Sequence, residues 1–265
     1  MRRLFDRTMP GGPGAVDVHD VLSGLTFPDG AGDRPYTWVN MIVSVDGKAV
    51  FGPPGTTWTV GSEVDHAIFK GLRGSADAVL TGAGVMLADD IPYPRLDLHA
   101  QARREARGLR PKPLWIIVSG RAQLPCDLQV FRGGRENVLV VVTERAPAEQ
   151  CRTLAEKAQI LVLGASTIDM GELGRVLRAR YGIRRLYSIG GPTLNGAMLA
   201  AGTLDELFFT LAPKLHGGHG LPSMVEGPNP DQLSGASLLS VYQANDELFL
   251  RYAVSPHARE AWPGV

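Results

Sequence analysis

Residues 187–196, Y-S-I-G-G-P-T-L-N-G, decide the fold of this chain. They follow an apolar run that begins at Ile183 and lead into a helix-like segment, residues 197–201, so two glycines and a proline stand where a strand would pass into a helix. Such a junction suits an anion, because helix N-termini present unpaired N–H groups and glycine lets a phosphate approach the backbone closely. Gly-Gly-Pro also serves in ordinary tight turns. The segment therefore predicts either a phosphate site or a simple turn.

The composition is typical of a globular protein without a net electrostatic field. Of the 265 residues, 44% are hydrophobic, and 27 basic residues balance 27 acidic ones. We therefore expect neither nucleic acid nor an anionic membrane as a partner. Cys126 and Cys151 lack C-x-x-C spacing, which argues against a disulfide framework or a structural zinc site. No apolar run has the length of a signal-peptide core or a membrane span, so we expect a cytoplasmic protein.

Strand-like and helix-like segments alternate on both sides of the opening stretch. Short apolar, β-branched runs predict strands at residues 36–45, 76–81, 114–118, 138–142, 160–163 and 206–211, besides the one that begins at Ile183. Helical patterns cover residues 148–159 and 170–180, and a further helix is expected between a capping Ser62, paired with Asp65, and Gly74. Residues 237–254 form two strand-like runs around Asn245-Asp246, which predicts an antiparallel hairpin.

This order predicts an α/β fold: a mostly parallel sheet flanked by helices, with an antiparallel C-terminal hairpin at its edge. Ligands of such sheets gather at the carboxyl ends of the strands, where Gly82, Ser119 and Gly190 fall. We interpret residues 1–33, with a single possible helical turn, as an arm packed on a main domain of residues 34–256. Residues 257–265 are interpreted as a tail.

Three other groups of residues allow more than one interpretation. Asp89-Asp90 is either a loop turn or an acid placed over the ligand cleft. The basic residues between 103 and 112 are either a solvated helix face or a phosphate contact. His216 and His219 flank two glycines in a loop, without the spacing of metal ligands, and we expect no metal. The G-x-x-x-x-G-K-[ST], G-x-S-x-G and H-E-x-x-H motifs are absent from the sequence.

Six motifs in one order carry a family resemblance. They are S-V-D-G at residues 44–47, T-T-W at 56–58, L-R-G-S-A-D-A-V-L-T-G-A-G at 72–84, L-A-D-D at 87–90, G-G-P-T-L-N-G at 190–196 and D-E-L-F-F-T-L-A-P-K-L-H-G-G at 205–218. Together they resemble the pyrimidine reductases of riboflavin biosynthesis: the C-terminal half of bacterial deaminase-reductases and the stand-alone archaeal and fungal enzymes. The resemblance covers about residues 35–254.

The resemblance implies a dihydrofolate-reductase-like fold, NADPH as cofactor and a homodimer. The family reduces a ribosylamino-pyrimidine 5′-phosphate to its ribitylamino form, by hydride transfer to C1′ of the ribose. It also implies residue roles. The residues matched to the cofactor are Val43, Trp58, Gly82, Val85, Asp89, Ser119, Gly190, Gly191, Pro192, Thr193, Leu194, Asn195 and Gly196. The residues matched to the substrate side are Asn40, Thr56, Arg73, Arg95 and Ile189, and Asp89 is the candidate catalytic residue.

Two departures from the family pattern bear on function. The H-x-E and P-C-x-x-C zinc signature of the deaminase is missing, so we expect no deamination. Ile189 stands where riboflavin reductases usually carry a glutamate that faces the substrate, and an alkyl group cannot accept the hydrogen bonds of a carboxylate. Two alternatives therefore stay open: an NADPH-dependent reductase of another heterocycle or a pterin, with dihydrofolate-reductase-like activity, and a nucleotide-binding protein without turnover.

Overall fold

The computed structural model of the chain describes residues 1–30, 32–49, 60–228 and 232–255. The strands are β1 (Arg2–Asp6), β2 (Gly14–Ala15), β3 (Tyr36–Ser44), β4 (Ala78–Gly82), β5 (Leu114–Val118), β6 (Val138–Val142), β7 (Gln159–Val162), β8 (Arg185–Ser188), β9 (Glu206–Ala212), β10 (Gly235–Ala244) and β11 (Glu247–Ser255). The α-helices are α1 (Val18–Gly24), α2 (Glu63–Gly74), α3 (Ala83–Asp89), α4 (Leu98–Ala106), α5 (Ala148–Ala155), α6 (Met170–Tyr181) and α7 (Pro192–Ala200).

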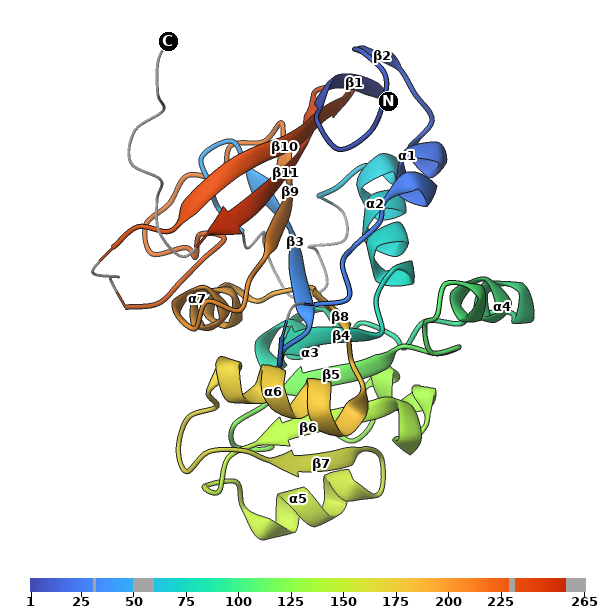
Figure 1. The fold of residues 1–265 in the computed structure, drawn as a ribbon. Helices are drawn as coiled ribbons and strands as arrows, with labels where there is room; N and C mark the ends of the chain where they lie inside the picture. The colour runs from blue at the N-terminus through green and yellow to red at the C-terminus, as the bar shows by residue number, and fades with distance from the viewer. Residues whose placement is uncertain (31, 50–59, 229–231, 256–265) are drawn as a thin grey trace.

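The described strands form one 11-stranded sheet in the order β2-β1-β10-β11-β9-β3-β8-β4-β5-β6-β7 (Figure 1). All pairings from β9 to β7 are parallel, whereas β11, β10, β1 and β2 add on in antiparallel fashion. The predicted mixed α/β fold with an antiparallel edge is thus confirmed. Because all seven parallel strands end at the same edge of the sheet, the loops and helices after β3, β4 and β8 meet there.

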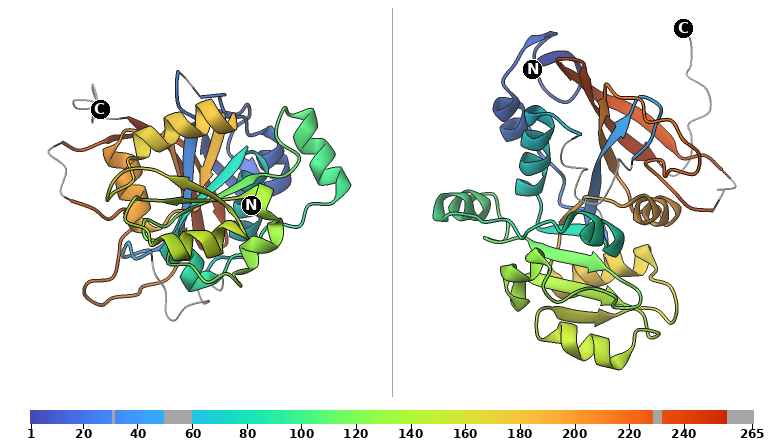
Figure 2. Two further views of the ribbon diagram at one scale, coloured as in Figure 1. Left: turned by 90° about the horizontal axis from the view of Figure 1, so that it is seen from below. Right: turned by 180° about the vertical axis from the view of Figure 1, so that it is seen from behind.

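Helices cover both faces of the parallel part of the sheet, as the views from below and behind show (Figure 2). On one face, side chains from α2, α3 and α5, such as Leu72, Met86 and Leu154, pack around the buried Trp115. On the other face, α6 and α7 pack on the alternate residues of the same strands, with Leu173 and Met198 in the core. The strands β4, β5 and β6 are buried on both sides, which explains their nearly continuous apolar sequences.

The N-terminal segment forms two strands of the sheet, although its Gly- and Pro-rich sequence predicts none there. Strand β1 pairs with β10, with Arg2 opposite Gln243, and β2 extends that edge. Arg251 fixes the segment from the other side: its guanidinium bonds the buried Glu206 at 2.8 Å and lies over the rings of Phe27 and Phe208. The residues before β3 thus supply two strands of the same sheet.

Several element boundaries differ from those predicted. Helix α7 begins at Pro192, five residues earlier than predicted, so Thr193, Leu194 and Asn195 are helical residues directly behind the glycines. Proline explains the start, because its ring fixes φ for the first helical position. Helix α5 ends at Ala155, and Gln159 already belongs to β7. Asp89 ends helix α3 instead of lying in a loop.

The basic cluster on α4 is not a solvated face throughout. Arg104 is 4% exposed and donates to the carbonyl oxygens of Gly74, Ala76 and Arg110. Burial lowers the pKa of its guanidinium to about 10. Arg104 therefore has a structural role: it satisfies carbonyl groups at the end of α2 and in the following turn.

Candidate functional site

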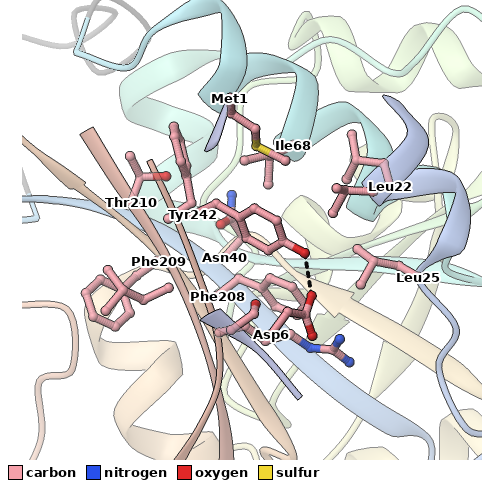
Figure 3. Close-up of a pocket in the computed structure, with 15 residues that line it drawn as sticks. Met1, Asp6, Leu22, Leu25, Asn40, Ile68, Phe208, Phe209, Thr210 and Tyr242 are labelled. Carbon is pink, nitrogen blue, oxygen red and sulfur yellow. Dashed lines mark hydrogen bonds between the residues drawn. The ribbon is translucent and has the colours of Figure 1, made fainter. Parts of the chain in front are cut away.

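A cleft of about 730 Å³ opens at the carboxyl ends of β3, β4 and β8. Its walls are α2 on one side and α3 with the first turn of α7 on the other, and residues of β3 form its floor. This volume lies in the range of roughly 300–1,000 Å³ that small-molecule sites occupy. A second cavity, between the N-terminal segment, α1, α2 and the sheet, has only about 40 Å³ and lies beside a Tyr242–Asp6 hydrogen bond (Figure 3). The larger cleft is the candidate site.

The glycine turn of the sequence forms one wall of this cleft. Gly190 and Gly191 have φ of 78° and 83°, a region that favours glycine, and the Gly82 N–H donates to the Gly190 carbonyl at 3.1 Å. Gly191 is the N-cap of α7 and offers no side-chain cap. Within the described residues, the backbone N–H groups of Thr193 and Leu194 donate to no acceptor. The turn therefore presents open donors at the positive end of a helix dipole, which suits a phosphate.

Asp89 and Asp90 both line the cleft but differ in their partners. Asp90 accepts hydrogen bonds from the backbone and side-chain nitrogens of Gln129, at 2.8 and 3.1 Å, and has φ of 41°. Asp90 is the C-cap of α3 and ties the helix to Gln129. Asp89 Oδ1 is buried and has no hydrogen-bond partner among the described residues. A buried carboxylate oxygen without a donor is costly to a fold, so Asp89 is the acid of this pair that is available to a ligand.

Positive side chains line the α2 wall. The Arg73 guanidinium lies over the Phe69 ring, 5.5 Å from its centroid, and makes no hydrogen bond or ion pair with another described residue. Burial lowers the pKa of the Arg73 guanidinium. An arginine side chain nevertheless keeps its proton and its positive charge in a protein. Lys70, one turn earlier, is exposed and lines the same cleft. This wall can bind an anionic group of a ligand.

Asp65 is a second cleft-lining acid that the sequence motifs did not single out. Its residue is 8% exposed, and its Oδ1 accepts a hydrogen bond of 2.6 Å from the Thr210 hydroxyl on β9. Its backbone N–H is capped by Ser62, as predicted. Burial raises the pKa of the Asp65 carboxyl, the Thr210 hydrogen bond opposes this, and nearby Glu247 adds to the rise. A sequence signal existed: Asp65, Ile68 and Leu72 share one helix face, so a carboxylate interrupts the apolar stripe.

The floor of the cleft contains two residues that the resemblance matched to the substrate side, Ile189 and Asn40. Ile189 is 7% exposed, follows β8 directly and lines the cleft. Asn40 on β3 lines it as well, beside the buried Tyr187. Burial raises the pKa of Tyr187, while the charge of Arg73 and the Asn40 side chain act against that rise. Ile189 therefore presents an apolar surface to a ligand at this position.

The structure brings together most of the residues matched by resemblance, but not all. Those that line the cleft are Asn40, Arg73, Gly82, Val85, Asp89, Ile189, Gly191, Pro192, Thr193 and Leu194, with Gly190 in the turn behind them. Val43 and Ser119 are buried and do not line the cleft, and neither does the exposed Arg95. Thr56 and Trp58 lie outside the described residues.

Asn195 and Gly196 do not line the cleft and have structural contacts instead. The Asn195 amide donates to the Met224 carbonyl at 2.9 Å. A Cβ on Gly196 would lie 1.9 Å from the Glu226 carbonyl oxygen, so only glycine permits this approach of chain and helix. Both residues hold α7 against residues 224–226 and thereby support the turn at Gly191.

Comparison with known proteins identifies relatives of this chain. The family model of the RibD C-terminal domain matches residues 35–248. The chain is 32% identical to the 2,5-diamino-6-ribosylamino-4(3H)-pyrimidinone 5′-phosphate reductase of Archaeoglobus fulgidus, over 73% of this chain and 87% of that protein. It is 31% identical to the protein of the same name from Methanothermobacter thermautotrophicus, over 83% of this chain and 99% of that protein.

Solved structures share the fold at lower sequence identity. A pyrimidine reductase-like protein from Corynebacterium diphtheriae superposes with a TM-score of 0.77 at 21% identity, over 90% of this chain and 99% of that one. A riboflavin biosynthesis reductase from Saccharomyces cerevisiae gives a TM-score of 0.58 at 18% identity, over 88% and 94% of the two chains. The chain therefore belongs to the RibD C-terminal domain family, the pyrimidine reductases of riboflavin biosynthesis, and is an oxidoreductase of that family.

Two further expectations concern features outside the cleft. No helix in the described part of the chain is both long and apolar enough to cross a membrane. In the same residues, no three side chains of the His, Cys, Asp and Glu types are grouped as metal ligands would be. The His216 backbone N–H instead donates to Asp46 Oδ1 at 3.0 Å, which fixes the turn after β3 to the loop after β9.

Proposed function

We propose that the protein is an NADPH-dependent reductase of 2,5-diamino-6-ribosylamino-4(3H)-pyrimidinone 5′-phosphate, or of the closely similar 5-amino-6-(5-phosphoribosylamino)uracil. The observation that carries the proposal is the composition of one cleft. An uncapped helix N-terminus, a carboxylate without a partner and an arginine without an acceptor face the same space at the carboxyl ends of the strands. The names of the Archaeoglobus and Methanothermobacter relatives support this substrate class.

The residues of the glycine turn fit a dinucleotide cofactor. The N–H groups of Thr193 and Leu194 would bind its pyrophosphate, and a Cβ built on the nearby Gly84 would meet nothing within 4 Å, so this glycine leaves open space. A Cβ on Gly191 would lie 3.4 Å from Val85 Cγ2, between the two helix ends, where it would narrow this space. When bound, the dihydronicotinamide supplies the hydride of the reaction.

The remaining cleft residues would bind and orient the substrate. Arg73 and Lys70 suit the sugar phosphate, since a guanidinium can donate two parallel hydrogen bonds to it. Asp89 would accept hydrogen bonds from ribose hydroxyls and so hold C1′ in place. In the open-chain sugar, C1′ is doubly bonded to the linking nitrogen; hydride addition to C1′ leaves the electron pair on that nitrogen, which takes up a proton. The product is the ribitylamine.

The direct test is oxidation of NADPH, followed by the loss of the absorbance of the reduced nicotinamide, with three compounds in parallel. These are the two ribosylamino-pyrimidine phosphates and dihydrofolate, since Ile189 leaves a pterin reductase as the competing assignment. We expect oxidation with a ribosylamino-pyrimidine phosphate and formation of its ribitylamino product. Turnover of dihydrofolate alone would contradict the proposal in favour of a pterin reductase. Tight NADPH binding without oxidation by any of the three would favour a protein without turnover.

The same resemblance supports two subsidiary proposals. We propose a homodimer, to be tested by light scattering on the full chain, and a cytoplasmic location, to be tested by fractionation of the cells that produce it. The exposed Leu215 and Leu233, at 79% and 76%, lie in the segment between β9 and β10 and are the apolar side chains that a partner could cover. A monomer at all concentrations tested would contradict the first proposal without affecting the site.

A further inference from the structure

We propose that the contact between Leu22 and Gly71 holds helix α2, and with it the basic wall of the cleft, in the position that binds the phosphate of the substrate. Both are positioning residues, because they lie outside the cleft and act on a ligand through Arg73 and Lys70. Leu22 belongs to the N-terminal segment, which lies before the residues that the family model matches, 35–248. The inference rests on the proposed function, since it concerns the affinity for the phosphate of that substrate.

Gly71 lets α1 approach α2 closely. A Cβ built on Gly71 would lie 2.7 and 2.8 Å from the two methyl carbons of Leu22 and 3.0 Å from its Cγ. Because the whole branched end of Leu22 lies over the glycine, a rotation of the methyl groups alone would not make room. Arg107 joins the same helices at their ends, since its Nη2 lies 3.4 Å from both the Leu25 carbonyl oxygen and the Ser75 hydroxyl. The two helices lie side by side in Figure 1 and again in the view from behind in Figure 2.

This contact lies on the face of α2 that points away from the cleft. The α2 side chains that line the cleft include Phe69, Lys70 and Arg73. Successive residues of an α-helix are about 100° apart, so Ile68 and Gly71 lie about 150° around the helix from the middle of that group. The N-terminal segment therefore supports α2 from behind, and a shift of the helix at Gly71 moves the cleft side chains with it.

The N-terminal segment also borders a space directly behind the floor of the cleft. Leu22 and Leu25 from α1 line the cavity of about 40 Å³ together with Ile68 from α2 (Figure 3). Asn40 lines both this cavity and the cleft. The segment is itself anchored in the sheet, because β1 pairs with β10. It thus connects the sheet to the rear of α2 without touching a ligand.

The position of Arg73 depends on α2 more than on its own partners. Its guanidinium lies over the Phe69 ring of the same helix and makes no hydrogen bond or ion pair with another described residue. A guanidinium binds a phosphate through paired hydrogen bonds of fixed geometry, and a misplacement of about 1 Å can cost up to about 100-fold in rate or affinity. A small displacement of α2 should therefore be visible in phosphate binding.

The test adds one methyl group at Gly71 and measures KM for the ribosylamino-pyrimidine phosphate with the full chain and NADPH. Gly71→Ala should raise KM by about ten-fold or more and leave kcat and the dissociation constant for NADPH within about two-fold. Alanine is the better helix former, so a weaker helix would not explain the loss. Gly74→Ala makes the same change at the end of α2, where a Cβ meets nothing within 4 Å. This matched control should keep the KM of the unchanged protein.

An exchange of size between the two positions distinguishes positioning from stability alone. Leu22→Ala removes the side chain that supports α2 and should raise KM by roughly three-fold. Adding Gly71→Ala to it should return KM to within about two-fold of the unchanged protein, because the new methyl group fills part of the emptied space. Multiplied single effects in the double variant, or a KM in Gly71→Ala equal to that of Gly74→Ala, would overturn the proposal. Leu22→Ala and the double variant avoid the clash, so they decide the question even if Gly71→Ala does not fold.

A binding measurement separates this proposal from the proposed function. Calorimetry with NADPH-loaded protein measures the affinity for ribose 5-phosphate, which need not react. We expect Gly71→Ala to bind it about ten-fold more weakly than Gly74→Ala does. If this difference is found but no ribosylamino-pyrimidine phosphate is reduced, the proposed function fails and the role of the Leu22–Gly71 contact stands. Equal affinities, or no binding to the unchanged protein, would overturn that role whatever the turnover.

Discussion

The Thr210 hydroxyl on β9 donates a hydrogen bond of 2.6 Å to Asp65 Oδ1 on α2. This bond joins the helix wall of the cleft to the strand on which the antiparallel part of the sheet is built. Both residues are almost fully buried, at 1% and 8% exposed. The bond therefore fixes the position of the acid at the edge of the site.

Replacing Thr210 by valine should destabilise the fold, because it leaves the buried carboxyl without its donor at nearly constant volume. Hydrogen bonds to charged groups contribute about 1.5–3 kcal/mol, so we expect a loss of about that size in the free energy of unfolding. Urea denaturation measures it. Thr210→Ser keeps the donor and should lose only about 1 kcal/mol, for the missing methyl group. If the valine variant were as stable as the serine variant, the bond would not matter to stability.

Asp65→Asn should make the protein more stable at neutral pH and change little in acid. Burial raises the pKa of Asp65 above its ordinary value of 3.8, and Glu247 adds to the rise. A raised pKa in the folded state means that the fold favours the protonated acid, so stability falls as pH rises through that pKa. The free energy of unfolding of the variant should thus exceed that of the unchanged protein by an amount that grows between about pH 4 and neutral pH. Unfolding followed at several pH values measures this difference. A gap that does not depend on pH would contradict this explanation.

Gly191→Ala should weaken NADPH binding by about ten-fold or more, because its methyl group enters the space between Val85 and the first turn of α7. It should also destabilise the fold by about 1–3 kcal/mol, since φ is 83°. Gly202→Ala is the matched control: φ is 63°, and a Cβ there meets nothing within 4 Å. It should cost stability but leave the dissociation constant for NADPH, measured by calorimetry, unchanged. If both variants bound NADPH with the same affinity, the glycine turn would not be part of the cofactor site.

Asp89 and Asp90 should behave differently although they are neighbours. Asp89→Ala should lower turnover by on the order of 10- to 100-fold with little change in melting temperature, because Asp89 Oδ1 makes no internal hydrogen bond that the change would remove. Asp90→Ala should lower the free energy of unfolding by about 1–3 kcal/mol, because it loses the bonds to Gln129 and strains a φ of 41°. Near-normal turnover in Asp89→Ala would end the assignment of a catalytic role to that residue.

The sequence predicts the parallel part of the fold well, because its strands are apolar on both faces and its helices carry capping residues such as Ser62 and Gly182. It does not predict β1, whose residues pair with β10 far along the chain and have no local strand pattern. The sequence also predicts that the glycine turn and Asp89 lie at the cleft, because the glycines and the order of the motifs along the chain can be recognised in the sequence. From the sequence, Asp65 is predicted only as the capping partner of Ser62; its position at the cleft depends on Thr210, 145 residues away.

The central claim is that this cleft transfers a hydride from NADPH to the ribose carbon of a ribosylamino-pyrimidine phosphate. It is tested most directly with two samples of NADPH, each of which carries one deuterium at C4 of the nicotinamide. The two samples differ in the side of the ring that carries the label. We expect one of the two forms to give a ribitylamino product with a single deuterium at C1′, seen by NMR and as a mass increase of about one unit. Oxidation of both labelled cofactors with no deuterium in the product, or with the label elsewhere, would contradict it.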